Sequence, residues 1–151
     1  MKAFVLEGRG KVSWVEKEAP VLKEEHGVLI EPLLLAPCTS DVHTIWQGSP
    51  KKKNLTLGHE CVGKIIKKGS AVKDFSVGEV VAVSAITPNW DDPEVRENEA
   101  HAGYPFSGHL LGKSIDGAFQ DCFYLPHADK NCGKIPEGLS LEDALLCTDV
   151  L

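Results

Sequence analysis

A chain of 151 residues, of which 42% are hydrophobic and 25% charged, can bury one hydrophobic core but not two, and it lacks the composition of a disordered segment. Its net charge of -6 argues against a surface that binds nucleic acid, and no apolar run approaches the roughly 20 residues that a membrane helix needs. We therefore expect a single domain without a nucleic-acid or membrane partner.

The chain begins with strand-like sequence and shows no signal-peptide pattern, so we expect a cytoplasmic protein with reduced thiols. The odd number of cysteines agrees with this expectation, because a complete disulfide framework needs an even number. The cysteines are Cys38, Cys61, Cys122, Cys132 and Cys147.

Most of the predicted elements are β-strands. In chain order, β-branched or alternating sequence predicts strands at residues 1–6, 11–18, 28–36, 61–68, 79–86 and 118–125. Gly8 and Gly10 lie between the first two strands and open no helix, so they predict a hairpin turn rather than a nucleotide-binding loop. The lysine run at 51–53 predicts a solvated turn, and the polar stretch at 88–103 predicts a long surface loop.

Two short helices are expected, one directly after Cys38 and one beginning near Ser140. Ser140 and Asp143 have the spacing of an N-cap and its N3 partner, which marks the start of the second helix. Both helices would touch the candidate metal-binding residues described next.

The position of Asp149 relative to two leucines predicts where its side chain lies. Leu141, Leu145 and Asp149 recur every four positions, which would place them on one stripe of the second helix. A carboxylate on an apolar stripe needs a partner, such as a metal ion. The alternative is that Asp149 caps or frays at the chain end. Cys147 is a rival donor, but on a regular helix it would point elsewhere, and a structural thiol is its expected role.

The most informative motif combines a metal-binding imidazole with a carboxylate in a glycine-punctuated segment: Gly58, His59 and Glu60, followed by Gly63, Gly69 and Val72. Cys38 lies upstream and Asp149 downstream. A thiolate, an imidazole and a carboxylate are good zinc ligands, and three protein ligands with one open position are typical of catalytic zinc. On a regular strand Cys61 would share the face of His59 and could compete, although packing in the core is its expected role.

This motif resembles that of the zinc-dependent medium-chain alcohol dehydrogenases, whose signature G-H-E-x-x-G-x-x-x-x-x-G-x-x-V is matched from Gly58 to Val72. Residues 37–44 and 147–149 are similar to the NADP-dependent secondary alcohol dehydrogenases in particular. The resemblance covers the whole chain. It implies a mainly β, GroES-like, partly open barrel with short helices, forming one zinc-binding catalytic domain at 1–151.

The resemblance also implies the roles of individual residues. The metal ligands would be Cys38, His59 and Asp149, with Glu60 able to approach as a fourth ligand. Water and substrate would exchange at that fourth position, so Glu60 is also a candidate catalytic residue.

Four neighbouring residues receive roles in the same way. Ser40 and His43 resemble a hydroxyl and imidazole relay that carries the substrate proton to solvent. Asp41 resembles a carboxylate that orients His59. From spacing alone, Ser40 and Asp41 are equally well explained as an N-cap pair, and that alternative stays open. Thr39 stands where several relatives carry a basic residue near the cofactor phosphates.

One catalytic zinc ion and NADP(H) are therefore the expected cofactors, the latter in the full-length enzyme. A four-cysteine structural zinc site is excluded, because residues 84–117 contain no cysteine. The expected substrate is a small secondary alcohol or ketone, with Ile86, Trp90 and Tyr104 in regions that line the pocket in the subgroup. The family is often a homo-oligomer. The histidines without partner spacing receive no role: His26, His101, His109 and His127.

No unit of the form strand, G-x-G-x-x-G and helix is present to bind a dinucleotide. We expect that Rossmann domain to lie outside this chain, and we expect the 151 residues alone to be inactive. Two alternatives remain: a polyol, diol or amino-alcohol dehydrogenase domain, and a stand-alone non-enzymatic metal-binding or interaction module. Apolar side chains that would face the missing domain should be exposed and promote self-association: Leu145, Leu146, Val150 and Leu151.

Overall fold

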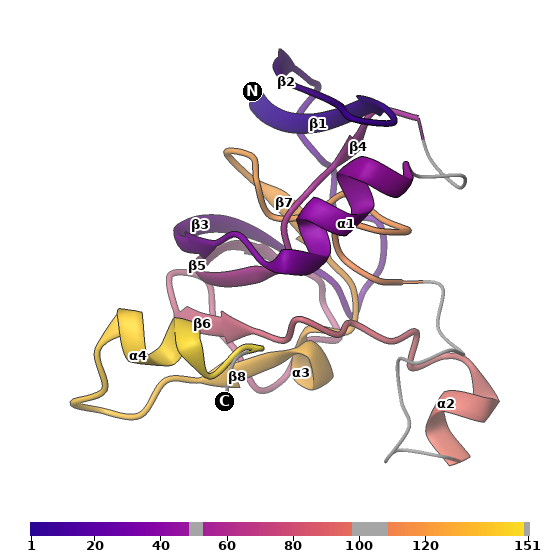
Figure 1. Ribbon diagram of the computed structural model, residues 1–151. Coiled ribbons are helices and arrows are strands. Elements are labelled where there is room, and N and C mark those ends of the chain that lie inside the picture. Colours follow the sequence, from indigo (N-terminus) through magenta and orange to yellow (C-terminus); the bar gives the residue numbers. More distant parts are fainter. Residues whose placement is uncertain (49–52, 98–108, 150–151) are drawn as a thin grey trace.

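The computed structural model describes residues 1–48, 53–97 and 109–149 (Figure 1). Short helices are inserted between strands that account for most of the regular structure. The strands are β1 Lys2–Gly8, β2 Lys11–Glu16, β3 Val28–Ala36, β4 Leu55–Thr56, β5 Glu60–Lys68, β6 Val80–Val83, β7 Phe123–Leu125 and β8 Cys132–Lys134. The helices are α1 Thr39–Gln47, α2 Pro93–Glu97, α3 Ala128–Asn131 and α4 Leu141–Leu146.

The strands form two antiparallel sheets. The smaller has the order β2-β1-β4 and lies at the top of Figure 1, and the larger has the order β7-β3-β5-β6-β8. Backbone hydrogen bonds join β1 to segments that lead into the larger sheet: Phe4 N–H donates to Phe119 O (2.8 Å), before β7, and Leu57 N–H donates to Phe4 O (3.1 Å), before β5. Within the described residues the strands do not close into a complete barrel, as the prediction of a partly open barrel requires.

The core lies on the inner side of β3 and β5, which form the longest strand pair. Pro32 sits inside β3, where it cannot donate a ladder hydrogen bond, and the register of the pair shifts between Pro32 and Leu34. The largest fully buried side chains of the core come from four strands and a loop: Ile30, Ile65, Val81, Leu111 and Phe123.

Two glycines allow a close backbone approach behind β4. Gly117 N–H donates to Thr56 O (2.8 Å) and Ala118 N–H donates to Gly58 O (2.9 Å). A Cβ at Gly117 would lie 2.1 Å from the carbonyl oxygen of Gly58, which no side chain can tolerate. Gly58 has a φ of 92°, in the region that favours glycine. This packing fixes the segment that leads into β5.

The strand predictions are confirmed in position but not always in length. The strand at 28–36 is found with the same bounds, and those at 1–6, 11–18 and 61–68 differ by at most two residues at either end. The strand at 79–86 is shorter, because β6 ends at Val83, and only the last three residues of 118–125 form β7. The Gly8 to Gly10 hairpin turn is confirmed.

The sequence did not predict β4, β8, α2 or α3, each of which has five residues or fewer. So short a segment shows no clear hydrophobic period. Helix α2 interrupts the surface loop that we expected at 88–103, of which 98–103 lies outside the described residues.

Helix α4 begins as predicted, since Ser140 Oγ accepts a hydrogen bond from Asp143 N–H (3.1 Å). It ends earlier than predicted, at Leu146, and the turn that follows is closed by Thr148 Oγ1 donating to Leu145 O (2.7 Å). The prediction that Asp149 shares a helical stripe with Leu141 and Leu145 is therefore wrong, because Asp149 lies in the turn beyond the helix.

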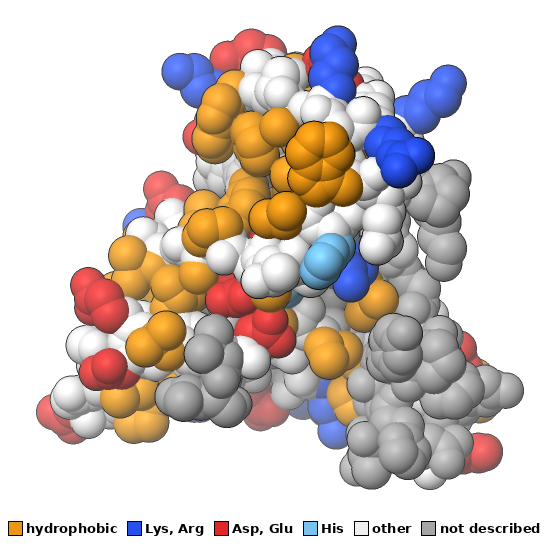
Figure 2. Space-filling view, in the orientation of Figure 1, with side chains coloured by type: hydrophobic (Ala, Val, Ile, Leu, Met, Phe, Trp, Pro, Cys, Tyr) orange, Lys and Arg blue, Asp and Glu red, His pale blue; other side chains and the backbone are white. Residues whose placement is uncertain are grey.

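Hydrophobic side chains are exposed at several places in the view of Figure 2, in its upper part and over α4 at lower left. Trp14 on β2 and Trp46 on α1 are the most exposed aromatic residues of the described chain, at 66% and 64%. Leu146 is exposed and Leu145 half-buried, whereas Val150 and Leu151 lie outside the described residues. Self-association through this end stays a prediction. No helix in the described ranges has the length and apolar character needed to span a membrane.

We expect Gly117→Ala to destabilise the domain by about 1–3 kcal/mol, because the added methyl group would overlap backbone atoms that cannot move aside. Urea unfolding followed by circular dichroism measures the loss. Gly8→Ala is the matched control, since a Cβ at Gly8 meets no atom within 4 Å. Equal stability of the two variants would contradict the close approach behind β4.

Candidate metal centre

The N-terminus of α1 positions the first candidate ligand. Cys38 is the N-cap residue, and its sulfur accepts a hydrogen bond from Ser40 N–H at 3.5 Å. The side chain of Asp41 returns the contact by accepting from Cys38 N–H at 3.0 Å, which completes a capping box. Cys38 is thus held just outside the helix, with its sulfur against the first turn.

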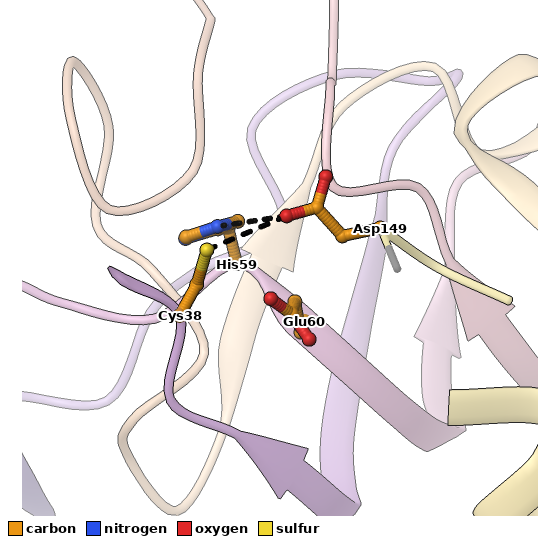
Figure 3. Close-up of side chains that lie close together, drawn as sticks. All are labelled: Cys38, His59, Glu60 and Asp149. Carbon is orange, nitrogen blue, oxygen red and sulfur yellow. Dashed lines mark hydrogen bonds and ion pairs between the residues drawn. The ribbon is translucent and has the colours of Figure 1, made fainter. Parts of the chain in front are cut away.

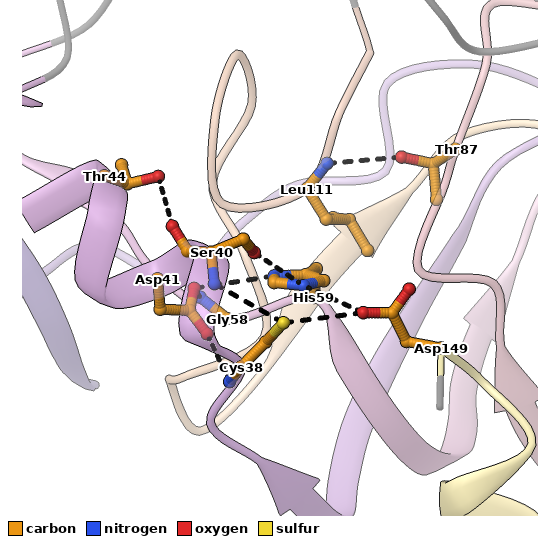
Figure 4. Close-up of polar contacts among 9 residues, drawn as sticks. All are labelled: Cys38, Ser40, Asp41, Thr44, Gly58, His59, Thr87, Leu111 and Asp149. Atoms are coloured by element: carbon orange, nitrogen blue, oxygen red, sulfur yellow. Dashed lines mark hydrogen bonds and ion pairs between the residues drawn. The ribbon is translucent and has the colours of Figure 1, made fainter. Parts of the chain in front are cut away.

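Asp41 also fixes the second candidate ligand, His59, which lies between β4 and β5 (Figure 4). Its Oδ1 atom accepts from Gly58 N–H at 3.2 Å and lies 3.5 Å from His59 Nδ1. Asp41 therefore caps the helix and orients the imidazole at once, so the two interpretations of this residue are compatible. The N-cap interpretation of Ser40 is wrong, because Cys38 occupies that position.

Burial and neighbouring charges shift the pKa values of Asp41 and His59 in opposite directions. Burial by itself raises the pKa of Asp41, but the contact with His59 and two backbone N–H groups bring it below its ordinary value. Burial by itself lowers the pKa of His59, but Asp41, helped by the charges of Asp149 and Glu60, raises it above its ordinary value. The imidazole is surrounded by negative charge, which favours a cation at this place.

Cys38, His59, Glu60 and Asp149 lie close together, as Figure 3 shows. Asp149 Oδ2 lies 3.5 Å from Cys38 Sγ and 3.8 Å from His59 Nε2. Glu60, the first residue of β5, is 3% exposed and completes the group. One ligand atom from each of the four lies within 4.8 Å of those of the others.

The remaining candidate residues lie along the start of α1. Ser40 Oγ is 3.1 Å from His59 Nε2, on the side of the ring that faces Asp149. Thr44 holds this turn of the helix by donating from Oγ1 to Ser40 O at 2.8 Å. Thr39 and His43 are exposed on the same helix and do not belong to the group of four.

A cavity of about 210 Å³ opens beside the group. Its lining is mostly apolar, and Lys113 adds one positive charge. Leu110, Leu111 and Lys113 were not foreseen, because their segment carries no motif and reaches the cavity only through the fold. The lining residues are Ser40, His59, Ala85, Ile86, Leu110, Leu111, Lys113 and Asp149.

Of the three residues expected to line the substrate pocket, the structure describes two, and one of these lines the cavity. Ile86 lies in the cavity wall. Trp90 does not line it and instead donates from Nε1 to Asn131 Oδ1 at 3.0 Å. Tyr104 lies outside the described residues.

The two rival cysteines are not in the group. Cys61 is fully buried in the core cluster, and burial raises the pKa of its thiol to about 12. Cys147 is exposed at the C-cap of α4.

The donor set fits a catalytic zinc ion on its own chemistry. One thiol sulfur, one imidazole nitrogen and carboxylate oxygens are the atoms that bind zinc in proteins. Asp41 satisfies the other ring nitrogen of His59, as the partner of a metal-binding histidine commonly does.

The chain is similar to known proteins over most or all of its length. The family model described as the alcohol dehydrogenase GroES-like domain matches residues 24–137. An NADP-dependent isopropanol dehydrogenase of Thermoanaerobacter brockii is 39% identical over 153 residues, which covers 100% of this chain and 43% of that protein. A protein of the same description from Entamoeba histolytica is 41% identical over 161 residues and is 42% covered.

Among solved structures, an alcohol dehydrogenase of Thermus sp. ATN1 superimposes with a TM-score of 0.82 at 27% identity. The superposition covers 99% of this chain and 44% of that chain. The chain thus spans less than half the length of these relatives. The similarity confirms the predicted GroES-like fold.

We expect the chain, reconstituted with zinc, to retain one tightly bound equivalent after dialysis, and Cys38→Ser to weaken this binding by at least roughly 10-fold. Competition with a chromophoric chelator measures the affinity. Cys147→Ser is the matched control, because its thiol is exposed and lies outside the group. Unchanged tight binding in a Cys38→Ser, His59→Ala double variant would refute the ligand set.

Thiol alkylation gives an independent check. In the folded, zinc-free chain, iodoacetamide should modify exposed Cys147 quickly and leave Cys61 intact, because a buried thiol with a pKa of about 12 forms almost no thiolate. Zinc should slow modification of Cys38 without affecting Cys147. Peptide mass spectrometry after timed quenching reports each site. Equal protection of Cys38 and Cys147 by zinc would contradict the assignment.

Proposed function

This chain belongs to the family of alcohol dehydrogenase GroES-like domains, and on that premise we propose that it is the catalytic domain of a zinc-dependent secondary alcohol dehydrogenase. The full-length enzyme would oxidise small secondary alcohols to ketones with NADP. The observation that supports this most directly is the group of four donors within 4.8 Å of one another, set beside a small cavity.

Cys38, His59 and Asp149 would hold the zinc ion, and Glu60 lies close enough to act as a fourth ligand. When bound there, zinc supplies a Lewis acid that makes the hydroxyl of a substrate alcohol easier to deprotonate. Asp41 keeps the imidazole of His59 aligned through Nδ1, which leaves Nε2 directed at the other donors.

Ser40 is suited to receive the substrate proton, because its hydroxyl lines the cavity and contacts His59 Nε2. His43 follows one helical turn later, at the i+3 position, and is exposed to solvent. We propose that the proton passes from Ser40 to His43 and then to water.

The cavity favours a small apolar substrate over a polyol. Its volume of about 210 Å³ is small, and its walls include Ala85, Ile86, Leu110 and Leu111. A polyol would lose hydrogen bonds to water and gain few partners, because Ser40 and Lys113 are the polar lining residues outside the metal group. This supports secondary alcohols within the family.

Several parts of the proposal concern the whole enzyme. The relatives described as NADP-dependent support NADP(H) as its cofactor, with Thr39 near the phosphates and the Rossmann domain outside this chain. We also propose a homo-oligomer, to which exposed apolar side chains such as Trp46 and Leu146 could contribute. The free thiols of all the cysteines agree with a cytoplasmic location.

The full-length protein should reduce NADP⁺ with 2-propanol, and Ser40→Ala should lower kcat by roughly 10²-fold through loss of the proton acceptor. Ser70→Ala, in an exposed loop, is the matched control. Steady-state absorbance at 340 nm follows the reaction. Turnover of sorbitol but not 2-propanol would contradict the substrate class, and an unaffected Ser40→Ala variant would contradict the relay.

The 151-residue chain alone should show no such turnover, because its sequence lacks the dinucleotide-binding unit that would place a nicotinamide against the substrate carbon. The loss of that positioning can cost roughly 10⁵ M or more in effective molarity. Activity that copurifies with the isolated chain through all steps would show that it binds the cofactor by itself.

A further inference from the structure

A second group of metal-binding side chains lies outside the candidate catalytic centre. Glu24 precedes β3, Asp91 precedes α2, and His127 precedes α3, and one ligand atom from each lies within 4.8 Å of those of the other two. No residue belongs to both groups. Because the three lie far apart in the chain, no spacing in the sequence indicates them, and sequence analysis gave His127 no role.

His127 is the buried member of this group. Its side chain is 7% exposed, and its Nε2 atom faces two oxygen atoms, Asp91 Oδ2 at 3.7 Å and Asn89 Oδ1 at 3.2 Å. A ring nitrogen that faces a carboxylate and an amide oxygen occupies a place where a proton or a metal ion can lie between them. Burial lowers the pKa of His127 below its ordinary value, which favours the neutral ring that a metal ligand requires.

Tyr124, a residue of β7, lies close to Glu24 and Asp91. Its hydroxyl oxygen is buried and interacts with the carboxylate of Glu24, although not in the geometry of a regular hydrogen bond. Burial, and then the charges of Glu24 and Asp91, raise the pKa of this phenol above its ordinary value. Negative charge therefore gathers at this place, where the ammonium of Lys23 lies over the Tyr124 ring at 5.4 Å from its centroid.

We propose that Glu24, Asp91 and His127 form a second metal site that binds a divalent transition-metal ion such as Zn²⁺. One imidazole nitrogen with two carboxylate oxygens is a set that zinc accepts, whereas Mg²⁺ and Ca²⁺ prefer oxygen ligands alone. Asn89 Oδ1 lies close enough to His127 Nε2 to supply a further oxygen.

A metal ion bound at this second site would tie the segment before α2 to the region of α3. Asp91 belongs to the segment before α2, which already touches the α3 region through the hydrogen bond from Trp90 to Asn131 and the stacking of Lys130 over Trp90. A metal ion held by Asp91 and His127 would fasten that segment at a second point. The carboxylate of Asp91 is 76% exposed, so it must be ordered on binding, and this site should be weaker than the first.

The test uses Zn²⁺ in chelator-buffered equilibrium dialysis with a Cys38→Ser, His59→Ala variant, in which the first site is disabled. We expect one saturable equivalent that resists millimolar Mg²⁺. Asp91→Asn and His127→Gln should each weaken it at least roughly 10-fold. Glu25→Gln is the matched control, because Glu25 is the exposed neighbour of Glu24 and lies outside the group.

The same experiment in the otherwise wild-type chain guards against misfolding of the double variant. There we expect two equivalents, of which Asp91→Asn removes only the weaker, and zinc should shift the ring resonances of His127 in step with its binding. Asp91 is exposed, so this substitution leaves the fold intact. The proposal would be overturned if the second equivalent were absent or if Mg²⁺ displaced it. It would also be overturned if Asp91→Asn and His127→Gln left the second equivalent unchanged, because that result would indicate an adventitious ion only.

Discussion

The carboxylate of Asp41 is the contact on which the candidate metal centre depends. It joins the N-terminus of α1 to the segment before β5, because one oxygen accepts from Cys38 N–H and the other from Gly58 N–H. The second oxygen also faces His59 Nδ1. Each contact needs an acceptor, and an amide side chain has one acceptor oxygen in place of two, so it could not accept from both Cys38 N–H and Gly58 N–H. A single buried charge thereby sets the separation of the thiol and the imidazole.

The segment that carries His59 is held from its other side by backbone packing. Gly117 and Ala118 donate hydrogen bonds to carbonyl groups of β4 and Gly58, at a distance that only glycine permits at position 117. Asp41 and this strand-like backbone therefore hold residues 57–59 between them. Rigid support of this kind matters for catalysis, because a ligand that shifts by an ångström no longer presents the productive geometry.

The local sequence pattern was sufficient to predict those parts of the candidate metal centre that lie in motifs. The sequence around Cys38 and His59 predicted the donor types, and β3 was predicted with its observed bounds because aliphatic residues fill it on both sides of Glu31 and Pro32. Asp149 was assigned to a helical stripe that does not exist, since α4 ends at Leu146. A four-residue period cannot show where the chain leaves the helix, and the carboxylate reaches the group through a turn instead.

Other residues of the two sites could not be predicted from the sequence, because only long-range packing brings them into place. Lys113 and Leu111 enter the cavity wall because their loop packs against the segment of Thr87, whose Oγ1 accepts from Leu111 N–H at 3.3 Å. Nothing in the local sequence encodes that long-range contact. The ring of His127 likewise meets Asp91 only after two distant segments have folded together.

The two groups of donors differ in how much order exists before a metal ion arrives. In the first, His59, Glu60 and Asp41 are all buried, and hydrogen bonds fix the ring and the helix start, so little conformational entropy remains to be lost. In the second, only His127 is buried, while Glu24 and Asp91 extend into solvent. A preorganised site suits chemistry, where geometry must be constant. A site with exposed carboxylates suits reversible binding, because ion binding and ordering of the segment then become one event.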